Sequence, residues 1–293
     1  MNSLRGLSTL LIVALVTLLL CLPLYLMGLL RALTRGRVRH GLDRQMDRIV
    51  DYWVGFHRWL FQVLRTTRLS VRWEGADELS RQRWYAVVSN HQSWADILIL
   101  QNVMRYRVPP LKFFTKRELI WIPLIGVAMW LLGFPYVRRL SREQIAANPS
   151  LAELDRKATL DACERFRELP SSVLNFLEGS RFTPAKHAAQ QGRFRHLLNP
   201  KTGGLSYVVA GLNDKLHKVL DVTISYPAGV PTFWQLLCGE CPEVEVLIRC
   251  HDLPADVVGC GDADRVRAGI GPWIESLWRD KDNRLAAARE PAN

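Results

Sequence analysis

The chain has 293 residues, of which 48% are hydrophobic and 23% are charged. This composition excludes a disordered chain, a coiled coil and a disulfide-rich mini-protein, and the length allows one large domain or two small ones. The formal net charge of +11 points to a polyanionic partner: nucleic acid, an anionic membrane surface or a phosphorylated substrate.

Residues 6–30 form an uncharged apolar run. As a helix, this run would reach roughly 37 Å, enough to cross a hydrocarbon core of ~30 Å with tilt. Arginines follow at once at positions 31, 35, 37 and 39, which does not suit a cleaved signal peptide. We therefore expect an uncleaved membrane anchor with a basic flank over residues 1–42, with the following chain in the cytoplasm. Pro23 leaves open a kinked helix that lies half-sunk in the membrane.

Residues 43–64 have apolar side chains at spacings of three and four, which predicts an amphipathic helix. Its Trp, Tyr and Arg residues favour a membrane interface, although an ordinary helix packed on the domain remains open. A second apolar run, residues 119–137, is interrupted by two prolines and two glycines. We expect it to be a buried or membrane-contacting element rather than a membrane span.

The rest of the chain predicts an α/β domain over residues 65–262, with a mixed sheet flanked by helices. A helix is expected over residues 149–169, with Asn148 as its N-cap. The short apolar runs that predict buried strands are residues 85–89, 171–177, 220–226 and 244–250. Residues 263–293 are expected to form a C-terminal helix and tail.

The six cysteines raise the question of a zinc site. Cys238 and Cys241 form a CxxC pair, and Cys250, His251 and Cys260 follow it. The second half lacks a matching ligand spacing. We therefore expect scattered, reduced cysteines and no metal.

Polar residues follow the first predicted strand in the segment Asn90-His91-Gln92-Ser93-Trp94-Ala95-Asp96. A His and an Asp five residues apart, on a turn that enters a helix, can place the carboxylate against one imidazole nitrogen and leave the other nitrogen free as a base. Catalytic groups often lie at strand ends in open α/β sheets. The spacing alone also arises by chance, so two unrelated surface side chains remain an alternative.

A second polar turn follows the strand at residues 171–177. Its residues Glu178, Gly179, Ser180 and Arg181 offer a guanidinium group on a tight turn, which suits bidentate recognition of a phosphate. A local ion pair that closes the turn is the alternative.

These segments, in this order, resemble the glycerolipid acyltransferase family, which includes the 1-acylglycerol-3-phosphate acyltransferases. The family's four blocks are matched by NHQSWAD at 90–96, by Lys116 to Gly126 with Arg138 and Arg139 beyond it, by FLEGSR at 176–181, and by the apolar strand 222–227 that ends in Pro227. Leu177 and Ser180 depart from the family's third block. Its extension, Arg-Phe-Thr-x-x-Lys at 181–186, resembles the branch of lysocardiolipin acyltransferase-type enzymes and their bacterial relatives.

The resemblance implies an O-acyltransferase of phospholipid biosynthesis or remodelling. It would move a fatty acyl group from an acyl thioester, acyl-CoA or acyl carrier protein, to a hydroxyl of a lysophospholipid. The expected acceptor is 1-acylglycerol-3-phosphate, with lysocardiolipin or lysophosphatidylglycerol as alternatives. No cofactor beyond the thioester co-substrate is expected. The implied location is the cytoplasmic side of the inner membrane, in contact with membrane lipids.

The resemblance also implies roles for single residues. His91 would take the proton of the acceptor hydroxyl, and Asp96 would hold the imidazole. The substrate-binding residues would be Glu178, Gly179, Ser180, Arg181, Arg139, Arg138 and Lys116. Of these, Arg181 and Arg139 would bind phosphate, with neighbouring Arg138 able to replace Arg139. Glu178 would orient Arg181 or bond the headgroup, and Lys116 would add a second phosphate contact.

Three rival interpretations fit the sequence less well. A serine hydrolase would use Ser93 beside His91, but the chain has no GxSxG elbow. A membrane-tethered nucleic-acid-binding or regulatory protein is suggested by the charge alone, and no aromatic-basic platform supports it. A catalytically silent scaffold conflicts with the presence of both His91 and Asp96. A further anion patch is conceivable at Arg193, Arg195, His196 and Lys201, where Thr202-Gly203-Gly204 could begin a helix.

Overall fold

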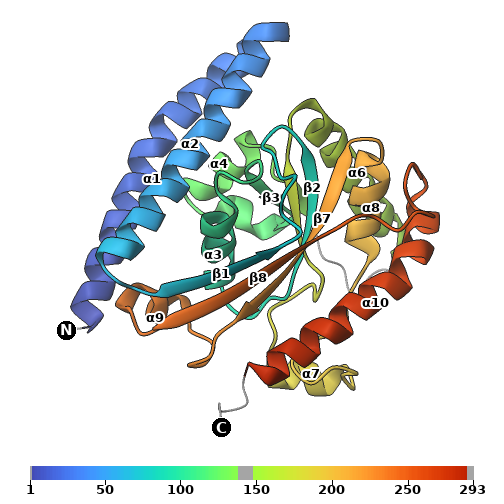
Figure 1. The fold of residues 1–293 in the computed structure, drawn as a ribbon. Helices are drawn as coiled ribbons and strands as arrows, with labels where there is room; N and C mark the ends of the chain where they lie inside the picture. The colour runs from blue at the N-terminus through green and yellow to red at the C-terminus, as the bar shows by residue number, and fades with distance from the viewer. Residues whose placement is uncertain (1, 138–147, 289–293) are drawn as a thin grey trace.

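A computed structural model of the chain describes residues 2–137 and 148–288 (Figure 1). Two long helices, α1 (Asn2–Leu33) and α2 (Gly36–Val63), form a hairpin that lies along one side of an α/β domain. The main strands are β1 (Arg68–Glu74), β2 (Trp84–Ser89), β3 (Leu111–Phe113), β6 (Ser172–Phe176), β7 (Leu216–Ser225) and β8 (Glu243–His251). The domain helices are α3 (Ala95–Met104), α4 (Ile125–Leu131), α6 (Pro149–Glu168), α7 (Pro184–Ala189), α8 (Gly203–Leu212), α9 (Phe233–Cys238) and α10 (Ala263–Ala287).

The six strands form one mixed sheet in the order β1-β8-β7-β2-β6-β3. Strands β7, β2, β6 and β3 are parallel to one another, whereas β8 is antiparallel to β7 and parallel to β1. The predicted α/β class with a mixed sheet is therefore confirmed. Because β2 lies between β7 and β6, the segments that follow these three strands meet at one edge of the sheet.

Strand β2 is buried on both faces. Ala86 and Val88 point to one side and Tyr85 and Val87 to the other, as the alternation of a strand requires. A strand covered on both faces has no solvent-facing polar positions, which explains why its sequence is a continuous apolar run. The helices that cover the two faces thus create two separate cores.

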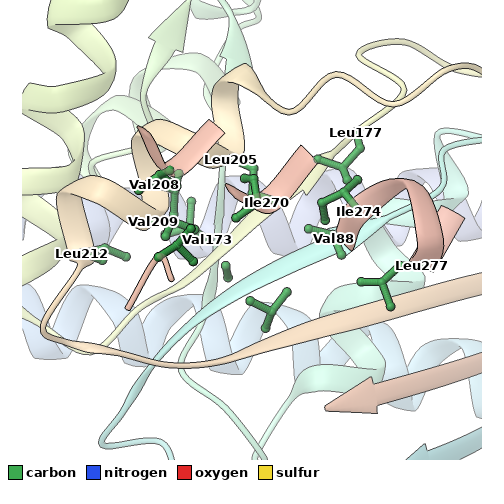
Figure 2. Packing of buried hydrophobic residues seen from close by; sticks show 14 of the residues in the cluster. Val88, Val173, Leu177, Leu205, Val208, Val209, Leu212, Ile270, Ile274 and Leu277 are labelled. Atoms are coloured by element: carbon green, nitrogen blue, oxygen red, sulfur yellow. The ribbon is translucent and has the colours of Figure 1, made fainter. Parts of the chain in front are cut away.

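One core lies between the sheet and helices α6, α8 and α10. Figure 2 shows Val88 and Val173 of the sheet packed near Leu205 of α8 and Ile270 and Ile274 of α10. Trp278 of α10 is fully buried there. The expected C-terminal helix is therefore present as α10, and its buried face is part of the core of the domain.

The second core lies on the opposite face, under α3 and α9, with Tyr85, Leu100 and Leu236 among its buried residues. Helix α2 contacts α3 on this side. It begins at Gly36, seven positions before the start expected from the apolar spacing.

Helix α1 is antiparallel to α2 and runs continuously through Pro23. The Arg31 side chain pairs with Asp43 at 2.6 Å, and the Trp53 indole donates to the Thr17 hydroxyl at 2.9 Å. At the other end, the Arg5 guanidinium donates to the backbone carbonyl of Leu64. Helix α1 is the only described helix that is long and apolar enough to cross a membrane.

The second apolar run of the sequence does not form a long helix. It contains part of a 3-10 helix (Arg117–Trp121), the short α4 and the two-residue strand β5 (Tyr136–Val137), which pairs with β4 (Thr115–Lys116). Its prolines and glycines break the helix, as expected. Trp121 and Trp130 are exposed, and Tyr25 of α1 donates to the backbone carbonyl of Leu124 in this segment.

Candidate active site

Asn90 attaches the loop after β2 to the neighbouring strand β7. Its side-chain amide donates to the Ile224 carbonyl at 2.9 Å, and its amide oxygen accepts from the Ile224 backbone N–H at 2.9 Å. The Asn90 side chain thus exchanges two hydrogen bonds with the backbone of Ile224, as a neighbouring strand residue would. The position of His91 is therefore set by the sheet.

His91 and Asp96 form a buried pair. The His91 Nδ1 atom lies 2.8 Å from Asp96 Oδ2, and Asp96 is completely buried in the first turn of α3. Because the carboxylate accepts this bond, Nδ1 carries the proton and Nε2 presents a lone pair. The imidazole ring also stacks on Phe176 of β6, with ring centroids 3.9 Å apart.

The Asp96 carboxylate accepts three further hydrogen bonds. The backbone N–H groups of Gln92 and Ser93 donate to Oδ2 at 2.6 and 2.9 Å, and the Tyr226 hydroxyl donates to Oδ1. Burial, and then the negative charge of Asp96, raise the pKa of Tyr226, so the phenol stays protonated and remains a donor. These donors hold the carboxylate in one orientation against His91.

Ser93 is placed for a structural role. Its hydroxyl donates to the Pro231 carbonyl at 2.6 Å and accepts from the Ala95 backbone N–H at 3.2 Å. The side chain is also buried. This geometry argues against Ser93 as the nucleophile of a serine hydrolase.

Glu178 lies beneath the His91–Asp96 pair rather than at the surface. Its Oε1 accepts from the backbone N–H of His91 at 2.7 Å, and its Oε2 accepts from that of Leu198 at 2.9 Å. The side chain is fully buried. Its expected role was to orient Arg181 or bind the headgroup. The structure corrects this, because both carboxylate oxygens accept hydrogen bonds from backbone N–H groups. Burial, opposed by these two hydrogen bonds, raises the pKa of Glu178 to about 7.

The turn that contains Glu178 also holds the other side of His91, since Phe182 donates its backbone N–H to the His91 carbonyl at 2.7 Å. Gly179 has φ +69, and a Cβ at this position would lie 3.1 Å from the side chain of Lys201. Glycine thus provides both the left-handed turn and the room for a lysine beside the site. Ser180 is half-buried on the same turn.

Arg181 is exposed at the edge of the site. Its guanidinium carbon lies 4.9 Å from the centre of the Trp94 ring. A cation stacked on an aromatic ring keeps its N–H groups free to bind an anion. Arg181 and Lys201 are therefore two cations on or beside the turn after β6 that can receive a phosphate.

The expected second block is only partly visible. Lys116 is exposed on β4 and pairs with Glu118 at 3.5 Å, and among the described residues it has no hydrogen bond or ion pair with His91 or Asp96. Its partner across the ladder is Val137, the residue before Arg138. Arg138 and Arg139 lie outside the described residues.

Helix α10 supports the loop that carries Leu198. The Trp278 indole donates to the Leu198 carbonyl at 3.0 Å, and Asp282 accepts from the backbone N–H groups of Arg195 and His196. Arg193 pairs with Glu275 of α10 at 2.9 Å, so this side chain is not a free anion ligand. Helix α8 begins at Gly203, as the Thr-Gly-Gly sequence indicated.

The buried cysteines are spread over the fold. Cys238 lies in α9, Cys163 packs in the core on the opposite face of the sheet, and all six thiols are free. Within the described residues, the group of side chains that could hold a metal is His40, Asp43 and Glu168, which includes no cysteine.

Tyr226, Phe176 and Trp94 were not assigned roles from the sequence. Trp94 lies in the same block as His91, Phe176 ends β6 and Tyr226 follows β7, so membership of these blocks was the available signal. No sequence pattern near the motifs indicated that α10 would hold the loop at residues 195–198. The arrangement as a whole offers one buried base, a fixed carboxylate and exposed cations beside it.

Comparison with known proteins gives a family match. A family model described as Acyltransferase matches residues 70–227, more than half of the chain. Lysocardiolipin acyltransferase 1 of Danio rerio is 26% identical over 252 residues, which are 82% of this chain and 60% of that protein. The 1-acyl-sn-glycerol-3-phosphate acyltransferase gamma of Mus musculus is 26% identical over 185 residues, 58% of this chain and 44% of that protein. The matched regions thus span less than two thirds of these relatives.

A solved structure has a similar fold. The crystal structure of the 1-acyl-sn-glycerophosphate acyltransferase PlsC from Thermotoga maritima aligns with a TM-score of 0.58 and 19% sequence identity. The alignment covers 98% of each chain. The arrangement of a helical hairpin beside a mixed α/β domain is therefore shared over the full length.

Proposed function

Because the chain belongs to the glycerolipid acyltransferase family, we propose that it transfers a fatty acyl group from an acyl thioester to a free hydroxyl of a lysophospholipid. The acceptor is 1-acylglycerol-3-phosphate and the product is phosphatidate. Lysocardiolipin is the second candidate acceptor, favoured by the similarity to the Danio rerio protein over most of this chain and by the Arg-Phe-Thr-x-x-Lys sequence after Glu178-Gly179-Ser180.

The observation that carries this proposal is the His91–Asp96 pair at 2.8 Å, with Nδ1 bonded and Nε2 left as a base. The acceptor hydroxyl gives its proton to Nε2 while its oxygen forms a bond to the thioester carbonyl carbon. The carbon–sulfur bond then breaks, and the imidazolium returns the proton to the departing thiolate. General-base catalysis of this kind contributes ~10²–10⁴-fold in rate. A thiolate leaves readily, so these residues need form no covalent intermediate.

Phosphate recognition falls to the cations beside this pair. Arg181 stacks on Trp94 with its guanidinium exposed, and the Lys201 side chain lies against Gly179. We assign the acceptor phosphate to Arg181, with Lys201 as a second contact. Arg139, or its neighbour Arg138, remains a proposed phosphate ligand by family resemblance, and so does Lys116.

Helix α1 supplies membrane contact. Its apolar side chains form an exposed stripe along the whole helix, at Leu4, Leu7, Leu11, Leu15, Leu18, Leu22, Leu26, Leu29 and Leu33. The partner helix α2 carries eight charged side chains, seven of them between residues 37 and 51, and it pairs with α1 at three levels. A spanning α1 would draw those charges into the hydrocarbon, at a high cost in free energy. The helix therefore lies in the membrane surface, which is the alternative that Pro23 had left open.

The exposed Trp121 and Trp130 extend this apolar face next to the C-terminal half of α1. Trp side chains favour the membrane interface. The exposed arginines at 35, 37 and 39 then face anionic headgroups, which fits the cytoplasmic surface of the inner membrane.

The test is an assay of the purified protein across a panel of lysophospholipids with both acyl-CoA and acyl carrier protein donors, read by lipid mass spectrometry. We expect acceptor-dependent acyl transfer, and we expect His91→Ala to abolish it while the protein stays folded and membrane-bound. Full activity of His91→Ala, or thioester cleavage that needs no acceptor, would overturn the proposal.

Arg181→Ala should raise the KM for the phosphorylated acceptor, by about tenfold or more for the loss of one charge-assisted contact, and leave the KM for the thioester unchanged. Arg279→Ala is the control, because Arg279 is an exposed arginine on α10 with a partner at 3.9 Å. Unchanged acceptor kinetics in Arg181→Ala would move the phosphate site elsewhere.

A further inference from the structure

Asn175 is a buried polar side chain on β6 that the His91–Asp96 pair does not use. It is 7% exposed. The positions on the same face of the strand, Val173 and Leu177, pack in the apolar core under α8 and α10 (Figure 2). Within the described residues Asn175 has no hydrogen bond, and its Nδ2 atom is buried without a partner. Because an unpaired buried amide is unfavourable, it indicates a binding partner outside the chain.

The Asn175 carboxamide lies against the first turn of α8. Its Oδ1 atom is 3.3 Å from the place where a Cβ atom of Gly204 would be. Oδ1 and Nδ2 exchange places when the carboxamide turns by half a turn about its Cβ–Cγ bond, so either atom can face this helix. A hydrogen-bond acceptor bound at the start of α8 can therefore take the unpaired Nδ2 donor.

The start of α8 has the properties of an anion site. Its N-cap, Thr202, makes no side-chain hydrogen bond to the helix. Among the described residues, the backbone N–H groups of Gly203, Gly204 and Leu205 have no acceptor. A Cβ atom at Gly203 would meet nothing within 4 Å, and Gly204 is exposed, so an anion can approach the backbone closely. The helix has ten residues, and its dipole adds positive potential at this end.

Lys201 adds a cation between α8 and the turn after β6. Its backbone N–H donates to the Leu177 carbonyl at 2.7 Å, and its Nζ is 3.4 Å from the place where a Cβ atom of Gly179 would be. Lys201 is exposed and has no ion pair within the part of the chain that the structure describes. We call Asn175, Lys201 and the first turn of α8 the α8 subsite. It combines an amide donor, backbone donors and positive charge, which suit a phosphate group.

The α8 subsite and the Arg181 guanidinium belong to different faces of the sheet. Arg181 stacks on Trp94 at the start of α3, and α3 covers the face opposite to α8. A single phosphate bound by Arg181 therefore does not reach the first turn of α8. The two places are still close, because Gly179 is two residues from Arg181 and two residues span at most about 7 Å. A headgroup with two phosphates can occupy both.

We propose that the α8 subsite binds the second phosphate of an acceptor lipid whose headgroup has two phosphates joined by glycerol. Lysocardiolipin has this chemistry, whereas 1-acylglycerol-3-phosphate has one phosphate and occupies the Arg181 side alone. The inference rests on the proposed acyl transfer and extends its acceptor. Asn175 is then a specificity-determining residue, because its amide is paired only when a second phosphate is bound.

The experiment measures binding of two deacylated headgroups to the full chain in detergent by titration calorimetry. Bis(glycerophospho)glycerol has two phosphodiesters, and glycerophosphoglycerol has one. The first variant, Asn175→Leu, removes the amide and keeps the branched shape. The second, Gly204→Glu, places a carboxylate at the exposed first turn of α8, where it also favours the helix. Thr223→Val is the control, since Thr223 of β7 has another buried, unpaired side-chain oxygen.

We expect the wild type to bind the two-phosphate headgroup about tenfold or more tightly than the one-phosphate headgroup. Both variants should lose this difference, and the control should keep it. The ratio of kcat/KM for lysocardiolipin to that for 1-acylglycerol-3-phosphate should fall by a similar factor in both variants. Equal affinity of the wild type for the two headgroups, or a difference that persists in both variants, overturns the inference.

Further outcomes separate the α8 subsite from the proposed reaction. If both lipids are acylated and neither variant changes the headgroup affinities or the ratio, the reaction stands and the subsite fails. If the variants lose the headgroup difference but no lipid is acylated, the subsite stands and the reaction fails. Inorganic phosphate is titrated in parallel. If it binds as tightly as the two-phosphate headgroup and both variants lose it, the subsite binds a free anion, which contradicts the assignment to an acceptor lipid.

Discussion

Besides His91, three other groups donate hydrogen bonds to the Asp96 carboxylate. Two backbone N–H groups and the Tyr226 hydroxyl share the carboxylate, and all lie away from water. A carboxylate with its lone pairs occupied cannot rotate without losing several bonds at once. The imidazole it holds is therefore fixed in orientation, and in the proposed reaction this preorganisation lowers the barrier.

Glu178 has a structural function next to this pair, and it should make stability depend on pH. Burial raises its pKa from the ordinary 4.5 to about 7, so the folded protein keeps this proton to higher pH than the unfolded chain. Between these two values the folded state binds more protons. The contribution of Glu178 to the free energy of unfolding therefore falls as pH rises, by about 3 kcal/mol in total.

We expect Glu178→Gln to lack this decrease. From about pH 5 to about pH 8, the wild type should lose most of those ~3 kcal/mol relative to the variant. Urea unfolding in detergent at both pH values measures the difference. His57 and His251, whose pKa values burial lowers, are present in both proteins, so their contributions cancel. Parallel pH dependences of the two proteins would contradict the assignment.

Helix α10 combines a hydrophobic and an ionic attachment to the sheet. Lys281 is fully buried, its Nζ lies 2.7 Å from Asp221 Oδ1 of β7, and it donates to the Val222 carbonyl. Arg249 of β8 binds the other Asp221 oxygen at 2.8 Å. Through Trp278, the same helix holds the loop that donates to Glu178. The C-terminal helix thus fixes the floor of the active site from the far face of the sheet.

The Lys281–Asp221 ion pair predicts how substitutions in α10 affect stability. Lys281→Met should cost about 3–5 kcal/mol in the free energy of unfolding, because it leaves Asp221 buried with one fewer partner. Adding Asp221→Val should recover part of that loss, since no buried carboxylate is then left without Lys281 and Arg249 keeps Asp280 as a partner. Arg279→Met on the exposed side of α10 should change little and serves as the control. Losses that add up in the double variant would show that the two side chains do not interact.

At the scale of the whole molecule, positive charge has two distinct places. Five arginines and no acid occur in residues 1–42, next to the apolar helix α1. Another five line a groove between α2, β1 and α3. Ten of the 39 basic residues thus lie in two places, the N-terminal segment and one concave site, and both fit the proposed contact with anionic lipids.

The orientation of α1 can be tested by labelling. We replace Cys250 and Cys260 by Ser, since the other four cysteines are buried, and introduce Cys at Ser3 or Arg35. A helix that lies in one leaflet leaves both ends on the same side. We therefore expect a membrane-impermeant maleimide to label both positions from outside when the protein is added to preformed vesicles. Protection of one end alone would show that α1 spans the bilayer.

Much of the site was predictable because its signals are local. His91 and Asp96 are five residues apart, so a turn that enters a helix brings them together without help from the rest of the fold. The buried strands β2, β6 and β7 were visible as short apolar runs, since strands covered on both faces have no polar positions. The family resemblance, carried by these segments, is confirmed by the family match over residues 70–227.

The sequence by itself therefore determined the α/β class, the dyad, the apolar first helix and the family. The tertiary structure decided which distant residues meet: Glu178 and Tyr226 reach the dyad only because β6 and β7 flank β2, and α10 joins the core only because it packs on the far face of that sheet. The same holds for α1, whose composition permits a span but whose pairing with the charged α2 places it along the domain. Short spacings constrain contacts within one turn or strand, whereas strand order and helix docking depend on the packing of the whole chain.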